Sequence, residues 1–115
     1  MNPPAYTVTV SQARPATVKE EKLSLRLVGV KDSRCPEGVQ CIWAGHAAVT
    51  LAVSQKGRPS QEVVIGTEAP DNLKLPFKGS YGPYTLALVK LEPRPTKAGG
   101  VPLPRYMATV QVTRP

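Results

Sequence analysis

Several residue types that carry chemistry are scarce in this chain. It holds one Trp, one Phe and four Tyr, and its only histidine is His46. A lone imidazole without a motif neighbour disfavours the nucleophile–base pairs of hydrolases and the multi-histidine sets of metal enzymes. The net charge is +7, yet no block of five basic residues and no alternation of basic with aromatic residues occurs. We therefore expect no enzyme, no cofactor or metal, and no nucleic-acid partner.

Long apolar runs are also missing, so no segment of the sequence is expected to span a membrane. What the chain has instead is valine, its commonest residue, together with 13 Pro and 9 Gly. This composition favours short strands separated by turns over helices. A length of 115 residues predicts one domain, 1–115.

Apolar residues alternate with polar ones in six segments, which is the pattern of half-buried antiparallel strands. The alternating sets are Tyr6/Val8/Val10, Leu23/Leu25/Leu27, Val49/Leu51/Val53, Val63/Ile65, Tyr84/Leu86/Leu88 and Ala108/Val110/Val112. The parity changes after Leu27 and after Leu88, which predicts a bulge at each place. Residues 55–60 suggest a hairpin turn, and 66–83 and 92–105 suggest long connections. We predict an all-β antiparallel sandwich, immunoglobulin-like, with six or seven strands; a small β-barrel is the alternative.

Cys35 and Cys41 are separated by five residues that include Pro36 and Gly38, which bend the chain. This spacing lets the two Cα atoms approach as closely as a disulfide needs, and it differs from the two-residue spacing of most zinc and redox motifs. We predict a disulfide and an oxidising compartment. The sparse acidic residues Asp32, Glu37, Asp71 and Glu92 are expected to serve as caps or to form ion pairs with neighbours such as Arg34.

The order of residue types in 32–45, D-S-R-C-P followed by C-x-W-A-G, resembles a segment of small, uncharacterised bacterial secreted or lipoprotein domains. The likeness continues more loosely in 84–88, in the Pro-rich 92–95 and in the segment from Tyr106. It implies export and an all-β domain, and it transfers no catalytic residue. Since Met1-Asn2-Pro3-Pro4 contains no export signal, we expect a mature chain, periplasmic or secreted, with a lipid anchor on the precursor as a further option.

Parity also orients the residues around the cysteines. If the chain is extended from Cys41, odd positions including Trp43, Val49 and Leu51 face the core. Trp43 is then a core anchor, with stacking on a ligand as the alternative. His46 falls on the opposite, solvent-facing parity, and Met107 likewise lies opposite Ala108 and Val110.

Two functions are compatible with these features. The first is a non-enzymatic interaction module that binds a protein or envelope component through its long loops. Its candidate binding residues are Trp43, Tyr81, Tyr84, Arg94, Lys97 and Arg105. The alternative is an envelope metal- or redox-handling protein that uses Cys35, Cys41, His46 and Met107.

Overall fold

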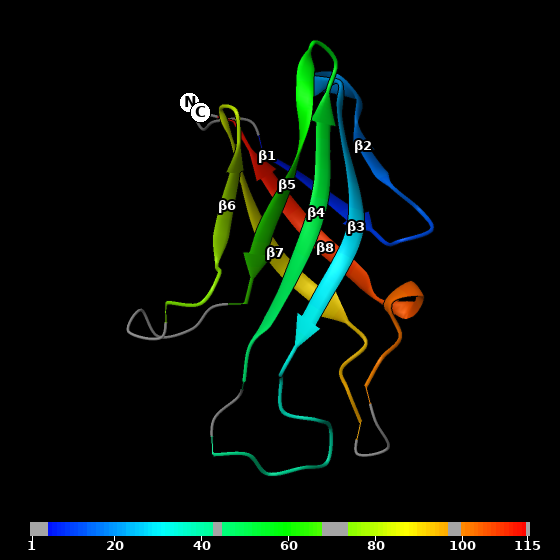
Figure 1. Cartoon of the computed structure of the whole chain (residues 1–115), viewed down its shortest axis with the longest axis vertical. Helices are drawn as coiled ribbons and strands as arrows, with labels where there is room; N and C mark the ends of the chain where they lie inside the picture. Colours follow the sequence, from blue (N-terminus) through cyan, green and yellow to red (C-terminus); the bar gives the residue numbers. More distant parts are fainter. Residues whose placement is uncertain (1–4, 43–44, 68–73, 97–99, 115) are drawn as a thin grey trace.

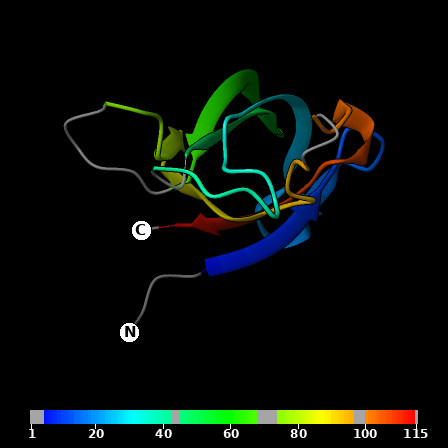
Figure 2. The same cartoon turned by 90° about the horizontal axis from the view of Figure 1, so that it is seen from below.

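A computed structural model describes residues 5–42, 45–67, 74–96 and 100–114 of the chain. Within them, eight strands form two four-stranded antiparallel sheets that pack face to face (Figure 1). The first sheet has the order β1-β8-β7-β6 and the second β2-β3-β4-β5, and Figure 2 shows them as two layers. The strands are β1 Ala5–Val10, β2 Ala16–Val18, β3 Leu23–Asp32, β4 Ala47–Gln55, β5 Arg58–Gly66, β6 Lys78–Tyr81, β7 Tyr84–Glu92 and β8 Met107–Thr113.

The predicted β-sandwich is confirmed, and the barrel alternative is wrong because both sheets are open. In the described residues, no ladder of hydrogen bonds joins β1 to β2 or β5 to β6. The six alternating segments became β1, β3, β4, β5, β7 and β8, so the expected count of six or seven strands is too low. The two further strands, β2 and β6, have three and four residues and are too short to show a period.

The connectivity differs from the immunoglobulin arrangement. All but one of the pairings seen here join strands that follow one another in sequence, and the exception is β1 with β8. Immunoglobulin sheets instead follow a Greek key in which several neighbours are distant in sequence. An immunoglobulin-like topology is therefore not confirmed, and the sandwich is built from two meanders.

The core lies between the sheets and includes most of the residues whose parity pointed inward. Leu23, Leu25 and Leu27 of β3 and Val49 and Leu51 of β4 are fully buried. Fully burying a Val or Leu side chain contributes about 1.5–3 kcal/mol, so these alternating positions supply most of the stabilisation. Both predicted bulges are confirmed: the β3–β4 register shifts between Leu27 and Gly29, and the β7–β8 register between Leu88 and Lys90.

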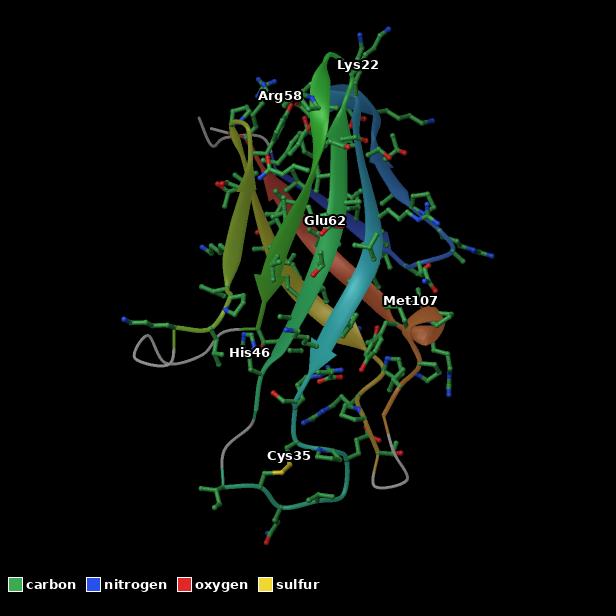
Figure 3. The ribbon with its side chains drawn as sticks, in the orientation of Figure 1. Lys22, Cys35, His46, Arg58, Glu62 and Met107 are labelled. Atoms are coloured by element: carbon green, nitrogen blue, oxygen red, sulfur yellow. A yellow bond between two sulfur atoms is a disulfide. The ribbon has the colours of Figure 1, made fainter. Side chains whose placement is uncertain are left out.

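One end of the sandwich is fastened by Glu21, which closes the short 3-10 helix η1, Lys19–Glu21. Its carboxylate accepts hydrogen bonds from the hydroxyls of Tyr6 (2.7 Å) and Tyr84 (2.9 Å) and pairs with Arg114 at 3.2 Å. The hydrogen bonds from Tyr6 and then Tyr84 hold the pKa of Glu21 below its ordinary value, against a smaller raising effect of burial. This carboxylate thereby ties η1 to β1, to β7 and to the residue that follows β8. The side chain of the neighbouring Lys22 marks this end in Figure 3, and the disulfide lies at the opposite end.

Candidate functional site

The chain leaves β3 at Asp32 and enters β4 at Ala47, and the segment between them forms one end of the molecule (Figure 3). Cys35 and Cys41 are joined by a disulfide with their Cα atoms 5.9 Å apart, which confirms the predicted bond. We call residues 35–41 the disulfide loop. Inside it, Val39 N–H donates to the carbonyl of Pro36 at 3.2 Å, so the backbone turns back on itself between the two cysteines.

A neck of close backbone contacts closes the base of this segment. The backbone N–H and the hydroxyl of Ser33 both donate to the carbonyl oxygen of His46, each at 2.8 Å. Gly45 lies in the left-handed region, at φ +82°, and a Cβ there would clash with the Ser33 carbonyl oxygen and would stand 2.8 Å from the Arg34 Cα. Only glycine meets both conditions, because L side chains avoid this φ and the space is already filled. The glycine that ends the W-A-G motif therefore has a structural reason.

A polar cluster beside the neck fixes the direction of the loop. Arg34 forms an ion pair with Asp32 through two contacts of 2.8 Å, from Nε to Oδ1 and from Nη2 to Oδ2. The remaining donors of the guanidinium reach the carbonyls of Leu91 (2.7 Å) and Pro93 (2.9 Å), and Tyr106 donates its hydroxyl proton to Asp32 Oδ2 at 2.7 Å. Three chain segments distant in sequence thus meet on one ion pair.

Burial and hydrogen bonding together set the pKa values of Asp32 and Tyr106. The side chains of Arg34 and Asp32 are only 12% and 6% exposed. Burial raises the pKa of Asp32, but the hydrogen bonds from Arg34 and Tyr106 outweigh it, so the pKa lies below its ordinary value. For Tyr106, burial and the hydrogen bond to Asp32 act together and raise the pKa to about 12. The carboxylate is therefore charged and the phenol neutral across the physiological range.

The residues that follow β7 brace the disulfide loop from the side. Glu37 N–H donates to the carbonyl of Pro95 at 3.0 Å, and Glu37 forms a parallel bridge with Thr96. The guanidinium of Arg94 donates to the carbonyl of Cys35 at 3.1 Å. The loop is thus supported by a covalent bond, by a buried ion pair and by a neighbouring segment.

The braced loop presents apolar side chains to solvent. Ile42, directly after Cys41, is fully exposed, and Val39 is 38% exposed. The exposed guanidinium of Arg94 lies against the same loop. The exposed side chains at this end are therefore two apolar residues with a cation beside them.

Two of the predicted binding residues are placed differently from the expectation. Tyr81 was expected on the long connection 66–83, and Tyr84 was expected both to begin a strand and to serve in binding. They are buried, at 1% and 3% exposure, because 78–84 folds into the hairpin of β6 and β7. Gly82, at φ +56°, begins its two-residue turn. A Gly at this position is typical of two-residue hairpins, and this was the signal that could have found β6. The tyrosine hydroxyls donate to the carbonyl of Pro59 (2.6 Å) and to Glu21.

The other predicted binding residues have mixed outcomes. Arg94 and Arg105 are exposed, Arg105 at the end of the 3-10 helix η3, Leu103–Arg105. Trp43 and Lys97 lie outside the described residues. The inward parity is confirmed for Ala47, Val49, Leu51 and Val53, but Cys41 is exposed because β4 begins only at Ala47.

His46 does not lie on the solvent face as expected. It is 5% exposed, and its Nε2 donates to the carbonyl of Pro76 at 2.8 Å, because the segment before β6 folds over it. Met107 is 52% exposed, as its parity predicted. Figure 3 shows Cys35, His46 and Met107 pointing to different regions, so the four donors of the metal or redox alternative are not brought together. Both of its thiols are used in the disulfide.

Sequence reasoning missed the central place of Tyr106. The pairing of Asp32 with Arg34 could be expected from two positions of separation, whereas Tyr106 is 74 residues away from Asp32. No local pattern carries that contact.

Comparisons with known proteins add no relative. Neither a family model nor a curated protein nor a solved structure matches this chain. In the described part of the chain, no helix has the length and apolar character needed to cross a membrane.

Proposed function

We propose that this protein is a non-enzymatic, extracytoplasmic interaction domain that presents its disulfide loop to a protein partner. The observation that carries the proposal is the fully exposed Ile42, directly after a disulfide loop that the residues following β7 support. A loop that is already ordered loses little conformational entropy when it binds, so its apolar side chains can contribute directly to affinity.

The disulfide supports a location outside the cytoplasm. Such bonds persist in the periplasm or after secretion and are rare where glutathione and thioredoxin keep thiols reduced. The resemblance of 32–45 to secreted and lipoprotein domains points the same way, and a lipid anchor on the precursor is compatible with both. Isolation of the protein under alkylating conditions from the cells that produce it tests the location. A mass two hydrogens below that of the reduced chain, in an envelope or secreted fraction, is expected.

Site-specific photo-cross-linking tests the binding surface. A photoreactive residue placed at Ile42 should capture one defined partner. The same residue at Met107 should not, because Met107 is exposed on β8 of the first sheet, outside the disulfide loop. The captured partner should be lost when Cys35 and Cys41 are both replaced by Ser, since the loop then loses its covalent brace. Identical capture at Ile42 and Met107, or capture that survives the double replacement unchanged, contradicts the proposal.

A further inference from the structure

The outer face of the second sheet has a hollow beside the neck of the disulfide loop. It has a volume of about 600 Å³, within the range of small-molecule sites in proteins. Residues that the argument uses among its lining are Lys31, His46, Ala48, Thr50, Val64 and Leu75. Val39, Ile42 and Arg94 are not among the lining residues, so the hollow is a separate feature of this end of the molecule.

Small residues create the hollow. The floor is the outer side of β4, where Ala48 pairs across the sheet with Gly66 on β5 and Thr50 pairs with Gly29 on β3. Ala48 and Thr50 thus each have a glycine as one cross-strand partner, and that partner contributes no side chain. The surface is therefore concave where larger residues would fill it.

Close contacts of His46 with Pro76 and Gly66 form the wall at one end of the hollow. His46 donates from Nε2 to the carbonyl of Pro76, and a Cβ at Gly66 would stand 2.8 Å from the imidazole ring. These contacts hold the segment of Leu75 over the end of the sheet. Leu75 and Val64, 37% and 44% exposed, give the rim its apolar character.

The charged side chains in the described lining of the hollow are Lys31 and Asp32. Asp32 is its acidic lining residue, and both carboxylate oxygens already accept hydrogen bonds from Arg34, with Tyr106 on Oδ2. The ammonium of Lys31 has no carboxylate within ion-pair distance among the described residues. Within the described residues, an apolar hollow with a cation at its rim that pairs with no carboxylate is complementary to an apolar anion.

We propose that this hollow binds a small amphipathic carboxylate. Its aromatic or branched aliphatic body lies on Ala48 and Thr50 between Val64 and Leu75, and its carboxylate pairs with Lys31. This site is independent of the partner surface at Ile42, and the two proposals fail separately.

Titration of the isotope-labelled protein, followed by NMR of the backbone amides, tests the site with three matched probes. 4-Phenylbutyrate, the neutral 4-phenylbutanamide and the cationic 4-phenylbutylamine share one apolar body and differ in charge. We expect 4-phenylbutyrate to shift the amides of Ala48, Thr50 and Val64 and to bind about two- to fivefold more tightly than the amide, the range of a partly exposed ion pair. The amine should bind most weakly. Lys31→Gln should remove the preference for the carboxylate and retain binding of the amide.

A pair of matched variants separates this site from general surface adsorption. Thr50→Phe fills the hollow and should abolish the shifts, whereas Thr85→Phe, on the outer face of β7 in the other sheet, should leave them unchanged. If Thr50→Phe does not fold, Val64→Asp, on an exposed edge-strand position, serves instead: it should weaken the carboxylate and favour the amine. Shifts that persist with the hollow filled, that scatter over the surface, or that are equal for all three probes would overturn the proposal.

Discussion

The ion pair of Arg34 and Asp32 should be the largest single polar contribution to the stability of the loop end, and Arg34→Met tests this. The substitution keeps most of the aliphatic stem but leaves the buried Asp32 carboxylate with Tyr106 as its remaining side-chain donor, and it leaves the carbonyls of Leu91 and Pro93 without their donor. Breaking a buried ion pair by removing one partner costs about 3–5 kcal/mol. Because the Arg34 side chain is 12% exposed and water can replace part of what is lost, we expect about 3 kcal/mol.

Urea denaturation followed by circular dichroism measures this cost, with Arg26→Met as the matched control. Arg26 lies on β3, and its side chain is exposed on the outer face, so its replacement should change the free energy of unfolding by no more than about 0.5 kcal/mol. Arg34→Lys retains the charge without the planar fork and should fall between the two. Equal unfolding free energies for Arg34→Met and Arg26→Met would refute the inference that the cluster holds the loop.

The pH dependence of the same comparison provides a second check. The folded-state pKa of Asp32 lies below its ordinary value, so the stability that this carboxylate contributes is present at neutral pH and is lost as the pH falls through that pKa. In Arg34→Met, protonation of Asp32 removes a buried charge that has lost its partner, so it does not cost the variant the same stability. The difference between wild type and variant should therefore shrink below about pH 4, near the ordinary pKa of Asp. A difference that stays constant from pH 7 to pH 3 would show that the charge is not its source.

Three further outcomes follow from the geometry. The folded-state pKa of Tyr106 is raised to about 12. The stability that this phenol contributes is therefore complete below its ordinary pKa of about 10 and is lost as the pH rises through 12. In alkaline denaturation, Tyr106→Phe should accordingly lose less stability than wild type between pH 10 and pH 12. Replacing Cys35 and Cys41 by Ala should cost about 2 kcal/mol in urea denaturation, as for a short disulfide loop, and a cost near zero would show that the loop holds its shape without the bond. Gly45→Ala should destabilise well beyond Gly57→Ala, because both lie at positive φ but a Cβ at Gly57 meets nothing within 4 Å; equal midpoints would contradict the close approach at the neck.

The sequence by itself determined the features that depend on neighbouring residues. Alternation with a period of two placed Leu23, Leu25 and Leu27 and the odd positions of β4 in the core, because successive side chains of a strand point to opposite faces. The breaks in that alternation located both bulges. The short spacing of Cys35 and Cys41 was enough to predict the disulfide, because it lets the two Cα atoms approach as closely as the bond needs.

Only the tertiary structure decided which segments meet. Tyr81 is buried because a four-residue strand pairs within what looked like a loop, and so short a strand has no readable period. The burial of His46 depends on a segment 30 residues away that packs over it. The cluster around Arg34 likewise needs β3, the end of β7 and the start of β8 to be adjacent. Such contacts arise from the way the two sheets stack, and local propensity carries no information about them.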